Sequence, residues 1–332
     1  MRTLYIVISF LILSSYQLNA QDLEWYINFH TFADNREYGK SYRTSQSILG
    51  ARFAPELGLQ IDSTHRFRVG FNVLHEFGSR KFIGQSSPIL YYQYSIKDVD
   101  FYIGSFPRHS LVSDYPNAIL NDTLNYYRPN VEGLLFKYQN SKVKQTVWLD
   151  WTSRQTTTDR ETFLAGVSGK YQPGTFFISH YATLFHYAGT AIEVEGDHLQ
   201  DNAAALVQVG LDLSHKTVFD SLTISAGGLM SFERTRGVTG WQTPKGALLA
   251  FYAGYRRLGL TNTLYIGEGH NLINGDKFYT AKTYNRSDFS WTPIRYKNIE
   301  GKLVLSFHFL EGIVDSQQAF GLRYNLGGRK SL

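Results

Sequence analysis

Apolar side chains recur at every second position along most of this chain. Successive side chains of a β-strand point to opposite faces, so a period of two indicates strands with one apolar and one polar face. The clearest example is the segment 66–73. Its large apolar residues Phe67, Val69, Phe71 and Val73 alternate with Arg66, Arg68, Gly70 and Asn72. A chain in which this pattern repeats from end to end is expected to fold as an all-β protein.

The composition agrees with that expectation and excludes several classes. Aromatic residues make up 15% of the 332 residues, and β-strands favour such side chains. The chain has no cysteine, which excludes a disulfide framework and a thiolate metal site. The net charge is only +5 and no basic run is present, so we expect no nucleic-acid partner.

The first twenty residues have the pattern of a secretion signal. Arg2 precedes the apolar stretch 4–13, and a more polar stretch ends at Ala20. We therefore predict a signal peptide over residues 1–20 and a single β-barrel domain over residues 21–332. No later stretch has 18 consecutive apolar residues, so no membrane-spanning helix is expected. Strands can still cross a membrane, because only every second side chain then faces lipid.

The strand count follows from the spacing of turns and from parity. Short and long connections alternate along the chain, as in outer-membrane barrels. Bacterial single-chain barrels have even strand numbers, so the segment 284–294 is assigned as a strand to complete the count. The predicted fold is an all-β transmembrane antiparallel β-barrel of about 16 strands, with 14 or 18 left open. The polar stretches 33–42 and 311–316 are expected to be loops, and the segment 317–326 is expected to close the barrel against the first strand.

The carboxy-terminal strand carries a motif as well as a pattern. Gly321, Tyr324 and Leu326 are similar to the signal that the barrel-assembly machinery reads, although Leu326 replaces an aromatic residue and six residues follow it. With the secretion signal and the strands, the chain resembles bacterial outer-membrane β-barrels of the porin type. Its tyrosine content and its predicted start at Gln21 resemble porin-like barrels of the Bacteroidota.

This resemblance implies a location and a set of partners. We expect the protein in the outer membrane of a Gram-negative bacterium, in contact with outer-membrane lipid. The barrel-assembly machinery would be its partner during biogenesis, and small polar solutes would be its cargo. The sequence leaves the oligomeric state open.

A barrel of this size encloses an aqueous lumen, and its polar face then lines that lumen. On this register Arg66, Arg68 and Arg323 are predicted to line the pore, which suggests a slight preference for anions. The third outer loop, within 106–130, carries apolar residues that a solvated loop does not need. In porins the third outer loop folds inward, so the resemblance implies a constriction formed by this loop. Its candidate residues are Arg108, Tyr126, Tyr127 and Arg128. The alternative is a surface cap over the mouth.

No arrangement of residues indicates catalysis. Asp34, Asp150, His180 and His308 are scattered, without the spacing of a metal site or a catalytic triad. We therefore predict no enzyme activity, no catalytic or metal-binding residue and no cofactor. The predicted function is a porin-like outer-membrane channel through which small polar solutes diffuse. The alternative is a non-conducting surface barrel that binds a ligand or partner through its outer loops, and a membrane-embedded hydrolase is a third hypothesis.

Overall fold

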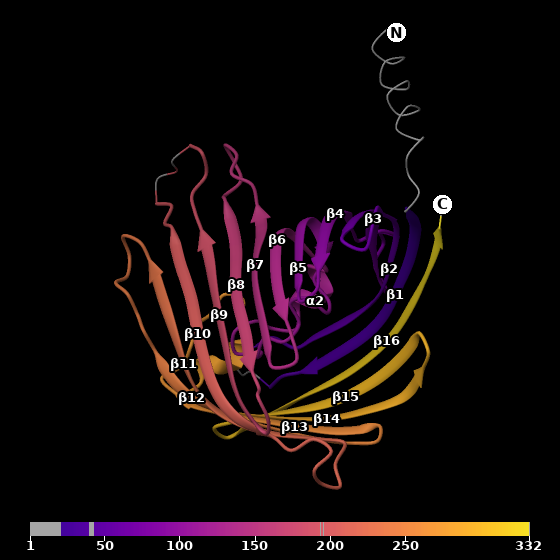
Figure 1. Ribbon diagram of the computed structural model, residues 1–332. Coiled ribbons are helices and arrows are strands. Elements are labelled where there is room, and N and C mark those ends of the chain that lie inside the picture. The colour runs from indigo at the N-terminus through magenta and orange to yellow at the C-terminus, as the bar shows by residue number, and fades with distance from the viewer. Residues whose placement is uncertain (1–20, 40–42, 193, 195, 332) are drawn as a thin grey trace.

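The computed structural model describes residues 21–39, 43–192, 194 and 196–331, and the predicted signal peptide lies outside these residues. Antiparallel strands follow one another around a single closed barrel (Figure 1). The strands are β1 (Asp22–Glu37), β2 (Gln46–Gln60), β3 (His65–Glu76), β4 (Gln85–Ile96), β5 (Val99–Pro107), β6 (Asn130–Gln139), β7 (Val143–Ser153), β8 (Thr162–Tyr171), β9 (Phe176–Tyr187), β10 (Gln200–Asp212), β11 (Ser221–Thr235), β12 (Lys245–Tyr255), β13 (Leu258–Gly267), β14 (Thr283–Tyr296), β15 (Ile299–Leu310) and β16 (Ile313–Ser331). The predicted fold class and the count of 16 are confirmed.

The first and last strands close the barrel. β1 pairs with β16 without interruption from Asp22 opposite Ser331 to Glu37 opposite Ser316. Both strands are longer than predicted. Residues 33–37 of the expected loop belong to β1, and β16 extends beyond 317–326 in both directions. In β1 the reason is that both faces are polar beyond the apolar band, so the alternation fades while the backbone pairing continues.

The two faces of the strands match the predicted register. Phe67, Val69 and Phe71 are exposed on the outer surface, whereas Asn72 and Leu74 on the opposite face are buried. A protein in hydrocarbon needs both an apolar outer surface and a closed barrel. The apolar side chains match the lipid, and the closure leaves no backbone group of an edge strand unpaired. This fold confirms the expected outer-membrane location and the contact with lipid. Among the described residues, no helix is long and apolar enough to cross a membrane.

The connections define the two ends of the barrel. Those after even-numbered strands are mostly tight, as at 97–98 and 256–257, and β1 begins and β16 ends at the same end. Those after odd-numbered strands are mostly long, as at 108–129 and 268–282. In outer-membrane barrels the short turns face the periplasm and the long loops face outward.

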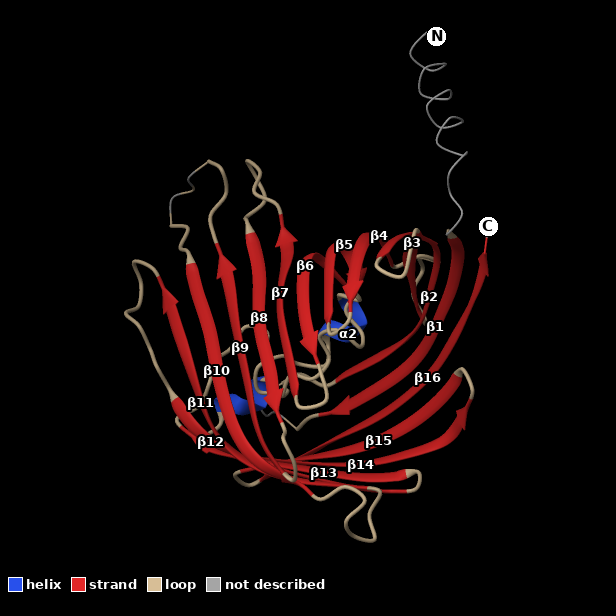
Figure 2. Ribbon diagram, viewed as in Figure 1, coloured by secondary structure: helices blue, strands red, loops and turns tan. Residues whose placement is uncertain are grey.

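The β5–β6 loop (residues 108–129) folds into the barrel with its short helix α2 (Leu124–Tyr127) (Figure 2). Arg108 forms a buried ion pair with Asp150 of β7. The hydroxyl of Tyr115 accepts a hydrogen bond of 3.0 Å from the indole of Trp148, also on β7. Trp148 lies flat here because Gly166 faces it; a Cβ at Gly166 would lie 2.4 Å from the indole ring. The predicted inward fold of this loop is thus present, anchored on the β7 wall.

The β13–β14 loop (residues 268–282) also enters the barrel and carries the 3-10 helix η2 (Lys277–Thr280). The ring of Phe278 stacks on Tyr284 of β14 at 5.3 Å and on His308 of β15 at 4.4 Å. The Tyr284 hydroxyl in turn lies 2.6 Å from Nδ1 of His308. Phe278, Tyr284 and His308 are fully buried, so this aromatic cluster fixes the loop to the wall.

The two inward loops contact each other. The amide of Asn121 donates to the carbonyl of Asn274 at 2.8 Å, and the amide of Asp276 donates to the carbonyl of Asn117 at 2.8 Å. A charge also holds the β5–β6 loop to the wall, because Asp122 pairs with Arg36 of β1 at 3.1 Å. Burial alone would raise the pKa of Asp122, but Arg286, Arg36 and Arg43 hold it below its usual value. Asp122 is therefore ionised at neutral pH where it meets Arg36.

Replacing Leu322 by arginine tests the assignment of the lipid face. Leu322 lies near the middle of β16 on the face opposite Arg323, so the substitution places a charge in hydrocarbon. We expect Leu322→Arg to lower the free energy of unfolding by about 2–4 kcal/mol in urea titrations of vesicle-embedded protein. Asn325→Arg, on the lumenal face of the same strand, is the matched control, and it should cost clearly less because its charge stays in the polar lumen. Equal effects of the two changes would contradict the register.

Replacing Asp150 by asparagine tests the anchor of the β5–β6 loop. The change leaves the buried Arg108 without its carboxylate, which costs roughly 3–5 kcal/mol when one partner of a buried pair is removed. We expect faster hydrogen–deuterium exchange of backbone amides across 108–129. Asp98→Asn, in the turn after β4, serves as control. Unchanged exchange in the Asp150 variant would show that the ion pair does not hold the loop.

Candidate functional site

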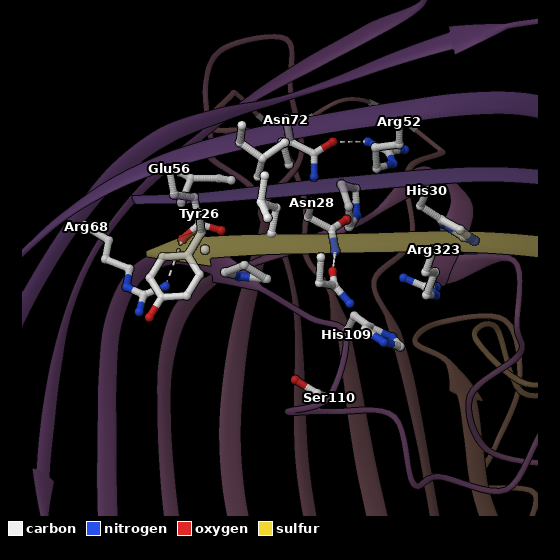
Figure 3. Close-up of a pocket in the computed structure, with 18 of the residues that line it drawn as sticks. Tyr26, Asn28, His30, Arg52, Glu56, Arg68, Asn72, His109, Ser110 and Arg323 are labelled. Atoms are coloured by element: carbon white, nitrogen blue, oxygen red, sulfur yellow. Dashed lines mark hydrogen bonds and ion pairs between the residues drawn. The ribbon is translucent and has the colours of Figure 1, made fainter. Parts of the chain in front are cut away.

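A cavity of about 750 Å³ lies inside the barrel, next to the β5–β6 loop. We call it the arginine cavity. Most of its wall comes from β1, β2, β3 and β16, with one residue each from β4, from β5 and from the β14–β15 turn. The remaining side comes from residues 108–110, 125 and 129 of the loop. Figure 3 shows the labelled side chains around it. They are Tyr26, Asn28, His30, Arg52, Glu56, Arg68, Asn72, His109, Ser110 and Arg323.

Most of the charge at the periplasmic edge of this cavity is paired. Glu24 forms an ion pair with Arg66 at 2.9 Å and accepts a hydrogen bond from Arg68 at 3.2 Å. Arg68 also lies 3.5 Å from Glu56, and its guanidinium group covers the ring of Tyr26 at 3.9 Å. Two arginines thus face two glutamates, so this edge contributes little net charge.

Arg52 and Arg323 differ from these arginines. Neither has a carboxylate within 4.0 Å among the described residues. Arg52 is 4% exposed and donates to the side chain of Asn72 and to the carbonyl of Tyr126, two neutral acceptors. Arg323 enters from β16 opposite His30 of β1. The two guanidinium groups therefore give the arginine cavity an excess of positive charge.

The imidazoles beside them add hydrogen-bonding capacity but little charge. His109 is exposed to the cavity, yet the barrel wall encloses it. This enclosure, together with Arg323, lowers the pKa of His109 to about 4, so the ring is neutral at pH 7. Positive arginines beside neutral donors and asparagine amides are suited to binding a carboxylate or a phosphate.

A smaller cavity of about 200 Å³ adjoins the first one and shares His30, Asn125 and Arg323 with it. Its other lining residues include Glu300 and Lys302 of β15. Arg323 therefore lies where the two cavities meet, which makes it the charged group common to both.

The seven residues predicted to line or constrict the pore are distributed unevenly. Arg68, Arg108 and Arg323 line the arginine cavity, and Tyr126 lines the smaller one while packing on Phe32 at 4.6 Å. The other three line neither cavity. Arg66 is held by Glu24, Tyr127 lies 3.4 Å from Glu76, and Arg128 lies 3.9 Å from Asp150.

Sequence reasoning missed Arg52, His30 and His109. Arg52 and His30 fall on the polar face of their strands, so a firm register for β1 and β2 would have identified them. His109 follows Arg108 in the predicted constriction loop. Its approach to Arg323 depends on how the loop folds, and no local pattern carries that information.

A serine–histidine contact lies at the outer end of the lumen. Ser231 of β11 is fully buried, and its hydroxyl lies 2.7 Å from Oε1 of Glu233 and 2.8 Å from Nδ1 of His270. A carboxylate only accepts, so the serine donates to Glu233 and the imidazole donates to the serine. Nε2 of His270 then remains a free base, buried without a hydrogen-bond partner in the described part of the chain.

Two features of this contact bear on its chemistry. Burial lowers the pKa of His270 to about 4, so the ring is neutral at pH 7 and a weak base. An opening of about 490 Å³, lined by Glu233, His270 and Asn271 among others, lies beside it. The carboxylate contacts the serine rather than the histidine, which is not the order of a serine-nucleophile triad. Within the described ranges, no group of three or more potential metal ligands is found.

Solved structures with a similar fold include an outer membrane protein and a porin. A loop-deletion mutant of OmpT from Vibrio cholerae aligns with a TM-score of 0.57 and 9% identity, covering 92% of this chain and all of that one. OccK2 from Pseudomonas aeruginosa aligns with a TM-score of 0.53 and 9% identity, covering 92% of this chain and 98% of that one. A mutant porin from Rh. blastica aligns with a TM-score of 0.51 and 12% identity, covering 92% of this chain and 100% of that one. At these identities the likeness concerns the fold, and it confirms the expected porin-type barrel.

No curated protein matches the sequence. A family model described as Lipid A 3'-O-deacylase-type matches residues 15–325. This match corrects the prediction that the protein is not an enzyme, because the family is named for an enzyme activity. The prediction was wrong because it required a recognisable motif, whereas catalytic groups on different strands and loops leave none. The chain belongs to the Lipid A 3'-O-deacylase-type family.

Proposed function

We propose that the barrel binds small anionic solutes in its lumen and passes them across the outer membrane. The observation that carries this proposal is the pair Arg52 and Arg323, which line a cavity of about 750 Å³ and have no carboxylate within 4.0 Å among the described residues. The solute class is a small molecule with a carboxylate or a phosphate. This narrows the small polar solutes expected from the sequence to anions.

The physical argument rests on the cost of unpaired charge. A buried cation loses hydration, and only a partner of opposite charge offsets that loss. Arg66, Arg68 and Arg108 have such partners close by, whereas Arg52 and Arg323 have none within 4.0 Å in the part of the chain that the structure describes. An entering anion would complete their coordination through charge-assisted hydrogen bonds.

The inward loop supports selectivity over simple diffusion. It narrows the lumen beside the arginine cavity and brings His109 toward Arg323. Field lines focus in such a narrow, low-dielectric space, so a few unpaired charges strongly affect which ions pass. The anion preference would thus come from Arg52 and Arg323, since Glu24 and Glu56 neutralise Arg66 and Arg68.

Reversal potentials test this function directly. The double variant Arg52→Gln, Arg323→Gln should lower the permeability ratio of chloride over potassium at least about threefold in planar bilayers under a salt gradient. Arg80→Gln, in the exposed β3–β4 loop, is the control and should leave the ratio unchanged. An unchanged ratio in the double variant would refute the selectivity. Absence of any opening in the wild-type protein would refute conduction.

The family match favours a second candidate, the hydrolysis of ester-linked acyl chains of an outer-leaflet glycolipid. The described residues that best suit such chemistry are His270 and Ser231. His270 offers Nε2 as a general base for water, and Ser231 with Glu233 fixes its tautomer. The site lies in the outer half of the lumen, so a lipid would have to bring its acyl ester to the barrel mouth.

Mass spectrometry of lipid A tests the second candidate. Vesicle-embedded protein is incubated with lipid A, and release of a fatty acid is measured against time. If His270 is the base, His270→Asn should reduce release by about 10²-fold or more, since Asn retains the donor to Ser231 but not the base. His198→Asn, in the exposed β9–β10 loop, should act like wild type. No release from the wild type excludes this activity, and full release from His270→Asn excludes the assigned base.

A further inference from the structure

A pair of arginines lies on the outer surface of the barrel, above the apolar band. Asp201 at the start of β10 accepts from Arg234 at 2.5 Å and from Arg236 at 2.8 Å. Asp201 lies on the same face of β10 as Val207 and Val209, which are exposed toward lipid. Since the register is unbroken between these positions, the three charged groups face outward and not into the lumen.

Their level along the barrel axis is that of the outer-leaflet headgroups. Asp201 pairs across the sheet with His186 of β9, two residues beyond the exposed Leu184. The ring of His186 packs on Phe163 at 4.9 Å, and Phe163 packs on Trp151 at 5.5 Å. Such an outward-facing aromatic row marks the interface between hydrocarbon and headgroups in outer-membrane barrels.

Asp201 holds the guanidinium groups of Arg234 and Arg236 in place, and it is one carboxylate for two cations. Asp201 receives Nε and Nη2 of both arginines, so four donors meet one carboxylate. Trp241 of the β11–β12 loop, 54% exposed, supports Arg234 from one side at 4.2 Å. Nη1 of each arginine has no hydrogen-bond partner among the described residues. Two cations and one anion leave one net positive charge.

We propose that Arg234, Arg236 and Trp241 form a docking site for the phosphorylated sugar headgroup of an outer-leaflet glycolipid. The two free Nη1 donors suit phosphate oxygens, and the exposed indole offers a flat surface to a sugar ring. Asp201 positions the arginines and does not itself contact the ligand. A lipid is the source, because the site faces the membrane and not the lumen. This inference goes beyond both activities proposed above, since binding here requires neither conduction nor hydrolysis.

Binding of lipid A in detergent micelles tests the proposal. Fluorescently labelled full-length protein is titrated with lipid A that carries both phosphates, by microscale thermophoresis. Arg234→Gln, Arg236→Gln should raise the Kd about tenfold or more, which corresponds to the loss of charge-assisted contacts. The matched control is Arg256→Gln, an exposed arginine beside Tyr255 at the opposite, periplasmic rim, which should bind as wild type. Dephosphorylated lipid A should bind the wild type as weakly as the double variant binds lipid A.

Several results would overturn this assignment. Equal affinity of the double variant and the wild type would do so, as would equal affinity for dephosphorylated lipid A. Displacement of lipid A by an equal concentration of inorganic phosphate would show a site for soluble phosphate instead. Heat-modifiable migration in gels verifies that each variant is folded. Should the double variant not fold, Trp241→Ala replaces it and is expected to weaken binding severalfold. Binding is read without turnover, so its failure is distinct from failure of the proposed transport or hydrolysis.

Discussion

In hydrocarbon, a backbone amide or carbonyl group without a partner costs several kcal/mol, and the pairing of β1 with β16 removes that cost for the two strands that would otherwise be edges. The seam is the longest pairing in the barrel, and it reaches beyond the apolar band on its outer side. Asp34 and Arg36 of β1 are held at that height, where Arg36 meets Asp122 of the inward loop. The same closure that protects the edges therefore also positions a wall charge for the loop. Every lumenal feature depends on this fixed register.

Inside the barrel, the arginines fall into two groups, those with a nearby carboxylate and those without one. Arg36, Arg66, Arg68 and Arg108 are matched by carboxylates on neighbouring strands or on the loop, and these pairs hold the interior together. Arg52 and Arg323 have no carboxylate within 4.0 Å among the described residues, and both line the arginine cavity. The outward-facing Arg234 and Arg236 also outnumber their carboxylate, because both pair with the single Asp201. Ligand binding is expected where cations outnumber carboxylates, and that condition holds on both sides of the barrel wall.

The sequence predicted the parts of the fold that repeat and missed those that depend on tertiary contact. Period-two alternation and parity were enough for sixteen strands and for the faces of β3 and β16. The pattern failed at residues 33–37, where both faces of β1 are polar. The apolar residues of the β5–β6 loop indicated its inward fold, but the pairing of Arg68 with Glu24 and Glu56 requires residues from three strands. Ser231 and His270 are far apart in sequence, and the β13–β14 loop brings them together. Cleavage after Ala20 and the assembly signal at Gly321, Tyr324 and Leu326 stay predictions.

The contact between the two inward loops has a mechanical consequence. β7, which anchors the β5–β6 loop, and β15, which anchors the β13–β14 loop, lie half a circuit apart in the strand order. Hydrogen bonds between Asn121 and Asn274, and between Asp276 and Asn117, join the loops into a strut across the lumen. A strut resists flattening of the barrel under lateral membrane pressure. It also couples the loops, so that displacing one of them strains the anchor of the other on the far wall.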